Sequence, residues 1–242
     1  MNQTNPPKFK SRPLRRHPNR TALVFSPLAW LKLMFFLHAG ETEVGGFGVS
    51  SESDLLYVQD FVAIKQWASG MSVEFADDAV ADHFDAMVDA GLQPARFARI
   101  WCHTHPGNSP EPSAVDERTF SRVFGACDWS VMFIISNAGR TYARLRFGAG
   151  PGGSMLIPVE VDWAAWPRLS PEEAARLPQC MLEWAREHDR NISVIERGLI
   201  SIRGWDDAAD RDESYDLEPL VPGDPTIDQQ AVYEFEQEGV RP

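Results

Sequence analysis

The spacing of hydrophobic residues changes along this 242-residue chain, and the changes predict a mixture of strands and helices. Short apolar or alternating runs bounded by turn residues are typical of strands, whereas apolar residues repeated every three or four positions are typical of helices. We therefore expect strands at residues 22–25, near Glu43, and at 55–64, 129–136, 141–147 and 155–161. Helices are expected at residues 27–39, at 77–90 and from Ser170 to about residue 190. This order predicts an α/β fold of the α+β type with a C-terminal helical extension.

A further strand is predicted to lead directly into a pair of histidines. The apolar run of residues 97–102 precedes His103 and His105, and Pro106 should end the strand because it has no main-chain N–H to donate. Residues two apart on a strand point to the same face of a sheet, so the two histidines should project together. Cys102 should point to the opposite face, into the core.

A loop and a helix are predicted to follow the histidines. Residues 106–112 contain three prolines and a glycine, a composition typical of loops. Ser113 then begins a segment whose apolar residues have helical spacing: Val115, Phe120, Val123 and Phe124. The loop should return the start of this helix toward the end of the strand, with Asp116 in the first helical turn.

Two imidazoles and a carboxylate brought together in this way are the ligand types of a catalytic zinc ion, which takes three protein ligands and leaves a fourth position for water. Two simpler interpretations compete with a metal site. Ser113 and Asp116 also have the spacing of a helix capping box, which needs no metal, and a His-x-His sequence can be a surface pair. The conjunction of both histidines, the tight loop and the carboxylate favours a metal-dependent hydrolase, in which Ser113 can cap the helix and still face the site.

The segment HTHPGNSPEPSAVD, residues 103–116, resembles the signature of the JAMM (JAB1/MPN/Mov34) metalloprotease family. That signature is His-x-His-Pro, six further residues and then Ser-x-x-Asp, and the spacing here is the same. The family also has an upstream glutamate that enters an early strand and is followed closely by glycine, as Glu43 is in EVGGFG. The resemblance covers about residues 21–165 and implies a curved, mixed, largely antiparallel sheet flanked by helices.

The same resemblance implies a role for each site residue. The ligands of a Zn²⁺ ion would be His103, His105 and Asp116. Glu43 would act as general base and acid on the zinc-bound water, and Ser113 would help to stabilise the oxyanion. Zinc makes hydroxide available near neutral pH, a carboxylate moves the proton, and a hydroxyl donor stabilises the developing charge. Glu41 is an alternative base because it would share a strand face with Glu43, but the glycine pattern begins after Glu43.

Members of this family hydrolyse isopeptide or peptide bonds after the C-terminal glycine of ubiquitin or ubiquitin-like proteins. The resemblance therefore predicts a deubiquitinase-like zinc isopeptidase or peptidase for a ubiquitin-like protein, acting in deconjugation or precursor processing. A non-catalytic MPN-type scaffold is one alternative. A RadC-like, DNA-associated protein is another, because the Pro-Glu-Pro-Ser segment also resembles that branch. We expect no nucleic-acid partner, since the catalytic domain is not strongly basic.

Composition divides the chain into four regions. We expect residues 1–20 to be a basic, flexible arm, residues 21–168 the catalytic domain, residues 169–205 a helical extension and residues 206–242 an acidic tail. Twelve acidic and two basic residues give the tail a charge of −10, out of −12 for the whole chain. The tail is expected either to remain solvated and disordered or to dock a basic partner or fold back over the site.

Three scattered cysteines without CxxC spacing indicate no disulfide framework and suggest a reducing, cytoplasmic location. The apolar run at 27–39 is too short to span a membrane and contains Lys32, so no membrane association is expected. Residues 148–153 match a dinucleotide fingerprint formally but lead into a strand-like segment, which favours a turn. The remaining histidines, at positions 17, 38, 83 and 188, are expected on surfaces or at the ends of elements.

Overall fold

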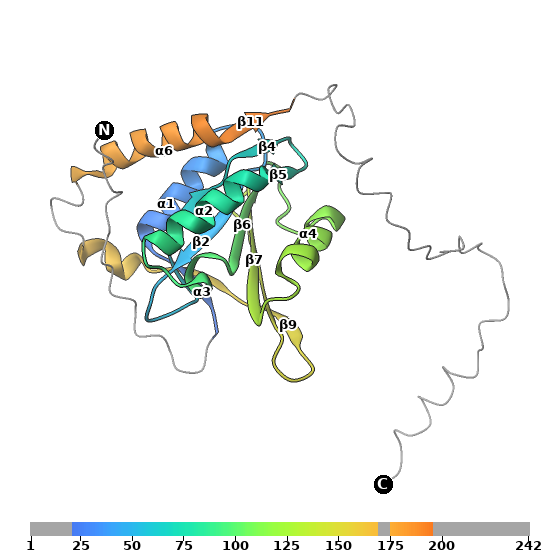
Figure 1. The fold of residues 1–242 in the computed structure, drawn as a ribbon. Coiled ribbons are helices and arrows are strands. Elements are labelled where there is room, and N and C mark those ends of the chain that lie inside the picture. Colours follow the sequence, from blue (N-terminus) through green and yellow to red (C-terminus); the bar gives the residue numbers. More distant parts are fainter. Residues whose placement is uncertain (1–20, 169–174, 196–242) are drawn as a thin grey trace, which may run out of the picture. The chain divides into compact units, whose positions relative to one another are not determined.

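The central element of the computed structural model is an eight-stranded sheet in the order β10-β1-β3-β2-β6-β7-β8-β9 (Figure 1). The structure describes residues 21–168 and 175–195, all within the first of two contact-defined units, Met1–Leu199 and Ile200–Pro242. The strands are β1 (Leu23–Phe25), β2 (Gly45–Ser50), β3 (Tyr57–Ala63), β6 (Ile100–His105), β7 (Trp129–Ser136), β8 (Thr141–Phe147), β9 (Gly153–Leu156) and β10 (Val159–Val161). Four of the seven pairings in this sheet are antiparallel, so the predicted mixed, largely antiparallel sheet is confirmed.

Helices cover both faces of the sheet, which confirms the α+β class. They are α1 (Pro27–His38), α2 (Asp77–Asp89), α3 (Pro94–Phe97), α4 (Ala114–Phe124) and α6 (Leu177–Asn191), with a 3-10 helix at Trp163–Arg168. Helix α1 begins as predicted, with Pro27 in its first turn and the Ser26 hydroxyl accepting a hydrogen bond from the N–H of Ala29. None of the helices in the described part of the chain has both the length and the apolar character needed to span a bilayer.

Alternation along β6 and β7 builds a separate hydrophobic core on each side of the sheet. Cys102 and Phe133 point to the α1 side, where they pack in a cluster with Leu33 and Phe36. Trp101 and Met132 point to the other side, where Phe120 and Phe124 of α4 and partly buried residues of α2 cover them. Cys102 is therefore a core residue, as predicted, and all three cysteines of the chain are free thiols.

The observed strands differ from the predicted ones in two places. Phe97 belongs to the short helix α3 and not to the histidine strand, because Pro94 starts a helical turn there. The predicted strand at 155–161 is two strands on opposite edges of the sheet: β9 pairs with β8, whereas β10 pairs with β1. Pro158 lies at the break, where its missing N–H suits the point at which the chain leaves one ladder for another.

A three-stranded sheet attaches the helical extension to the rest of the fold. Its strands are β4 (Gln66–Ala68), β5 (Val73–Phe75) and β11 (Ile192–Val194), in the order β11-β4-β5. Helix α6 leads into β11 and lies beside α1 (Figure 1), where Glu187 Oε2 is 2.8 Å from the Nζ of buried Lys32. The predicted start of this helix at Ser170, the basic arm and the acidic tail lie outside the described residues.

Candidate metal centre

The structure brings His103, His105 and Asp116 together, with one potential ligand atom of each within 4.8 Å of the others. Asp116 Oδ1 lies 3.4 Å from His103 Nε2, and Asp116 Oδ2 lies 3.6 Å from His105 Nε2. His103 is 1% exposed, and the side chain of His105 is only slightly more accessible. The predicted convergence of two imidazoles and one carboxylate is therefore a property of the fold.

Strand β6 orients both histidines toward the α4 side of the sheet. It lies between β2 and β7, with His103 opposite Gly45 on one side and Ile134 on the other. The His103 ring stacks on Trp101, two residues earlier on the same face, with the ring centroids 4.3 Å apart. This packing fixes the first imidazole in a rigid, buried position.

Asp116 combines helix capping with its position beside the histidines. Ser113 is the N-cap of α4, and its hydroxyl accepts a hydrogen bond from the N–H of Asp116 at 3.1 Å. In return, the N–H of Ser113 donates to Asp116 Oδ2 at 2.7 Å. The capping box and the metal site proposed from the sequence are thus compatible, because an ionised carboxylate has about four acceptor positions and the box uses one.

The loop after β6 determines the orientation of the second imidazole. Nδ1 of His105 lies 3.0 Å from the carbonyl oxygen of Ser109, which suits a tautomer with the proton on Nδ1 and a free lone pair on Nε2. The N–H of Asn137 donates to the carbonyls of His105 and Gly107, and the Arg140 guanidinium donates to the carbonyl of Asn108. The turn between β7 and β8 therefore holds the loop that orients His105.

Glu43 lies at the same end of the sheet, just before β2. Its Oε1 is 3.9 Å from His105 Nε2, too far for a direct hydrogen bond. Burial raises the pKa of Glu43 to about 7, with His105 opposing the shift and Asp116 adding to it. Glu41, the alternative base, is exposed. The structure thus brings Glu43, and not Glu41, against the imidazole–carboxylate cluster.

Four hydrogen bonds that the sequence did not indicate hold the backbone around Glu43. The N–H of Glu43 donates to the carbonyl of Ser69, and the N–H of Val44 donates to Thr104 Oγ1. The buried amide of Gln66 bonds to both main-chain groups of Gly45. Thr104 sits between the two histidines, a position that could have suggested a supporting role, whereas nothing in the sequence distinguishes Gln66.

Burial and mutual contacts shift the pKa values of all three residues of the cluster. Burial opposes ionisation of Asp116, but the nearby His103 and His105 and the N–H of Ser113 hold the pKa of Asp116 well below its usual range. Burial lowers the pKa of His103, which favours the neutral imidazole that a metal requires. For His105 the desolvation is outweighed by Asp116, the Ser109 carbonyl and Glu43, so its pKa is raised.

Two observations indicate that these three residues can hold a metal ion. His103 Nε2 and His105 Nε2 are buried and have no hydrogen-bond partner, although buried polar atoms are normally paired. In a tetrahedral site with bonds of about 2.0–2.2 Å, ligand atoms lie about 3.4 Å apart, close to the 3.4 and 3.6 Å between imidazoles and carboxylate. The three residues therefore lie close enough together to bind a metal ion.

One of the other histidines departs from its predicted position. His83 of α2 was expected on the surface, but it is buried against the sheet and stacks on Phe47 with the ring centroids 5.5 Å apart. Val80, Phe84 and Met87 of α2 pack against the core, and His83 is buried beside them.

Comparisons of the whole chain with models of protein families and with curated proteins find no match.

Proposed function

We propose that this protein is a zinc-dependent isopeptidase or peptidase that cleaves after the C-terminal glycine of a ubiquitin-like protein. The observation that carries the proposal is the convergence of His103, His105 and Asp116 with buried Glu43 at 3.9 Å from His105. The resemblance of residues 103–116 to the JAMM signature supplies the substrate class. The three free cysteines are consistent with action in the reducing cytoplasm.

A zinc ion held by the two imidazoles and the carboxylate supplies a Lewis acid that polarises a carbonyl and lowers the pKa of water to about 7. Glu43 accepts the proton of the attacking water and delivers it to the nitrogen of the leaving amine, a role typically worth about 10²–10⁴-fold in rate. Glu43 is not one of the three residues whose donor atoms converge, which suits a role in proton transfer and not in metal binding.

In this proposal Ser113 stabilises the oxygen of the scissile carbonyl. Its hydroxyl oxygen accepts the helix-capping hydrogen bond from the N–H of Asp116. This bond leaves the hydroxyl hydrogen of Ser113 available for donation. The O–H can therefore donate to the carbonyl oxygen as negative charge develops there. A diglycine tail suits such a site, because a segment without side chains can approach ligands that are almost completely buried.

The decisive experiment compares zinc content and turnover in the full-length chain and two carboxylate variants. The substrate is a ubiquitin-like protein with a peptide extension after its Gly-Gly terminus, and cleavage is followed by mass spectrometry. Glu43→Gln should retain zinc and lose at least about 10²-fold in kcat, because it removes the proton acceptor and leaves the ligands intact. Glu41→Gln is the matched control, since Glu41 is an exposed carboxylate two residues away, and it should remain active.

Two results would contradict the proposal. Full activity of Glu43→Gln would remove Glu43 from the mechanism. Zinc binding without cleavage of any Gly-Gly substrate by the wild-type chain would instead favour a non-catalytic scaffold.

A further inference from the structure

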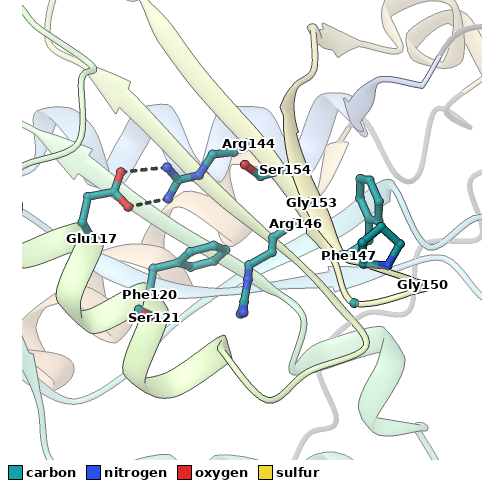
Figure 2. Close-up of a pocket in the computed structure, with 12 residues that line it drawn as sticks. Glu117, Phe120, Ser121, Arg144, Arg146, Phe147, Gly150, Gly153 and Ser154 are labelled. Atoms are coloured by element: carbon teal, nitrogen blue, oxygen red, sulfur yellow. Dashed lines mark hydrogen bonds and ion pairs between the residues drawn. The ribbon is translucent and has the colours of Figure 1, made fainter. Parts of the chain in front are cut away.

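A second candidate site lies between α4 and the β8–β9 hairpin, where the structure has an open cavity of about 550 Å³. Its lining includes Glu117, Phe120 and Ser121 of α4, Arg144 and Arg146 of β8, and Ser154 of β9 (Figure 2). Cavities of this size commonly bind ligands. None of these six residues belongs to the metal centre, so the cavity needs its own explanation.

The hairpin turn keeps one wall of the cavity free of side chains. Gly150 and Gly152 have φ angles of 61° and 70°, which L-residues with a side chain rarely adopt. At Gly153 a Cβ atom would lie 3.2 Å from the ring of Phe147, so glycine allows that ring to cover the strand. The turn thus presents backbone, one proline and an aromatic ring to a ligand.

The two arginines of the cavity differ in how their charges are compensated. Arg144 forms a two-point ion pair with Glu117, with N–O distances of 2.8 and 2.6 Å, and lies over the Phe120 ring. Arg146 donates one hydrogen bond, to the carbonyl of Phe124, and no carboxylate of the described residues forms an ion pair with it. A guanidinium has five N–H donors. The lining therefore carries one uncompensated positive charge, at Arg146.

The cavity opens beside a sheet edge with which no further strand of the described residues pairs. Strand β9 is the last strand of the sheet on that side, and all four of its residues are exposed. Leu156 is 66% exposed and pairs in register with Arg144, while Ser154 pairs with Arg146. Exposed edge strands accept an extended peptide through main-chain hydrogen bonds, and neighbouring pockets then select its side chains.

We infer that this cavity and the β9 edge form a binding site for an extended acidic peptide. The peptide main chain pairs with β9, a glutamate or aspartate side chain enters the cavity and pairs with Arg146, and an adjacent apolar side chain covers Leu156. The positive charge of Arg146 favours an acidic ligand. The edge of β9, unpaired among the described residues, favours a peptide over a small anion. The inference goes beyond the proposed function and requires neither a metal ion nor cleavage.

The site is close enough to the metal centre for one ligand to reach both. Asp116 and Glu117 are consecutive on α4, and the cavity-lining residue Ser121 lies five residues beyond Asp116, about 7.5 Å along the helix axis. A substrate whose peptide segment binds at β9 would therefore contact the protein at a second place, away from the bond that is cleaved at the metal centre. Binding and cleavage remain separately measurable, because the probe below contains no Gly-Gly terminus.

The test is fluorescence anisotropy at low salt with the full-length chain and a labelled peptide of alternating valine and glutamate. Two matched probes serve as controls. One has glutamine in place of every glutamate, and the other has proline in place of every second valine, at unchanged charge. We expect saturable binding of the acidic probe and at least about tenfold weaker binding of each matched probe. The glutamine probe loses the charged hydrogen bonds, and the proline probe loses the strand pairing. Hydrogen exchange at the β9 amides should slow only with the acidic probe.

Arginine variants locate the charge on the protein side. Arg146→Gln should weaken binding of the acidic probe about tenfold and leave the glutamine probe unchanged. Arg122→Gln is the matched control, because Arg122 is an exposed arginine of α4 outside the cavity lining. Three results would each overturn the inference. They are equal effects of the two variants, equal binding of the acidic and glutamine probes by the wild-type chain, and complete displacement of the acidic probe by millimolar inorganic phosphate. The probe comparison uses the wild-type chain, so it decides even if Arg146→Gln fails to fold.

Discussion

The side-chain amide of Gln66 holds the main chain of Gly45 in both directions, since Oε1 accepts from the Gly45 N–H at 2.7 Å and Nε2 donates to the Gly45 carbonyl at 2.8 Å. The same Nε2 donates to the carbonyl of Ile64. Gly45 is the first residue of β2, two residues after Glu43. This amide thus connects β4 to the segment that carries the proposed base.

Replacing Gln66 by leucine should lower the free energy of unfolding by about 1–3 kcal/mol, because it leaves the buried Gly45 N–H without an acceptor. Urea denaturation measures the change. Gln179→Leu is the matched control, since Gln179 is exposed on α6 and bonds only to a neighbouring side chain, and it should cost less than about 0.5 kcal/mol. Equal losses in both variants would show that the amide does not brace β2.

The glycines that follow Glu43 are required by close packing of β2 against its neighbours. A Cβ atom on Gly46 would lie 2.1 Å from the carbonyl oxygen of Val62 on β3, a contact that the backbone cannot relieve without moving. Gly46→Ala should therefore destabilise the protein by at least about 2 kcal/mol. Gly107→Ala, where no atom lies within 4 Å of the added Cβ, should change the unfolding free energy little. Thermal or urea unfolding of the pair tests this, and a stable Gly46→Ala would contradict it.

The central strands and the ligand cluster could be predicted from sequence because their signals are local. The bounds of β7 and β8 agree with the predicted 129–136 and 141–147, since each is a long apolar or alternating run beside a clear turn. The ligand residues followed from a fixed spacing on one strand, one loop and one helix. The small sheet could not be predicted, because its strands have three residues each and β11 pairs with β4 from more than a hundred residues away. The Gln66 amide is equally non-local.

Chelation should destabilise the zinc-loaded protein through loss of binding energy. A ligand present at about 100 times its dissociation constant stabilises the folded state by about 2.7 kcal/mol. EDTA should therefore lower the melting temperature of wild type, and of Glu41→Gln as a control. Asp116→Asn retains an oxygen for the capping bond from Ser113 but loses the ligand charge, so its melting temperature should not respond to EDTA. An equal response in Asp116→Asn would exclude Asp116 as a ligand.

The attachment of α6 depends on a buried charge. Lys32 is 6% exposed, and burial would lower its pKa, but Asp60 and Glu187 raise it above the ordinary value. Glu187→Gln should cost about 3 kcal/mol, because it leaves Lys32 with only half-exposed Asp60, 3.5 Å away. Removing both charges, Lys32→Met with Glu187→Gln, should recover most of that loss in urea denaturation, because glutamine keeps an oxygen for the hydrogen bond from the N–H of Ala63. A double variant no more stable than Glu187→Gln would contradict this account, and Glu183→Gln on the same helix serves as the control.

Burial of His83 should make the fold sensitive to mild acid. Desolvation lowers the pKa of His83 from 6.5 to about 4. Between pH 6.5 and pH 4 the unfolded chain binds a proton at His83 that the folded chain excludes. The contribution of His83 to the free energy of unfolding is therefore fully present above about pH 6.5 and is lost as the pH falls toward 4. The loss should be about 1–3 kcal/mol. His83→Gln cannot titrate, so its unfolding free energy, measured by urea denaturation from pH 7 to pH 4, should fall less steeply than that of wild type. Other groups titrate in both proteins and cancel in the comparison. Parallel pH profiles would show that the buried imidazole accepts its proton without opposing the fold.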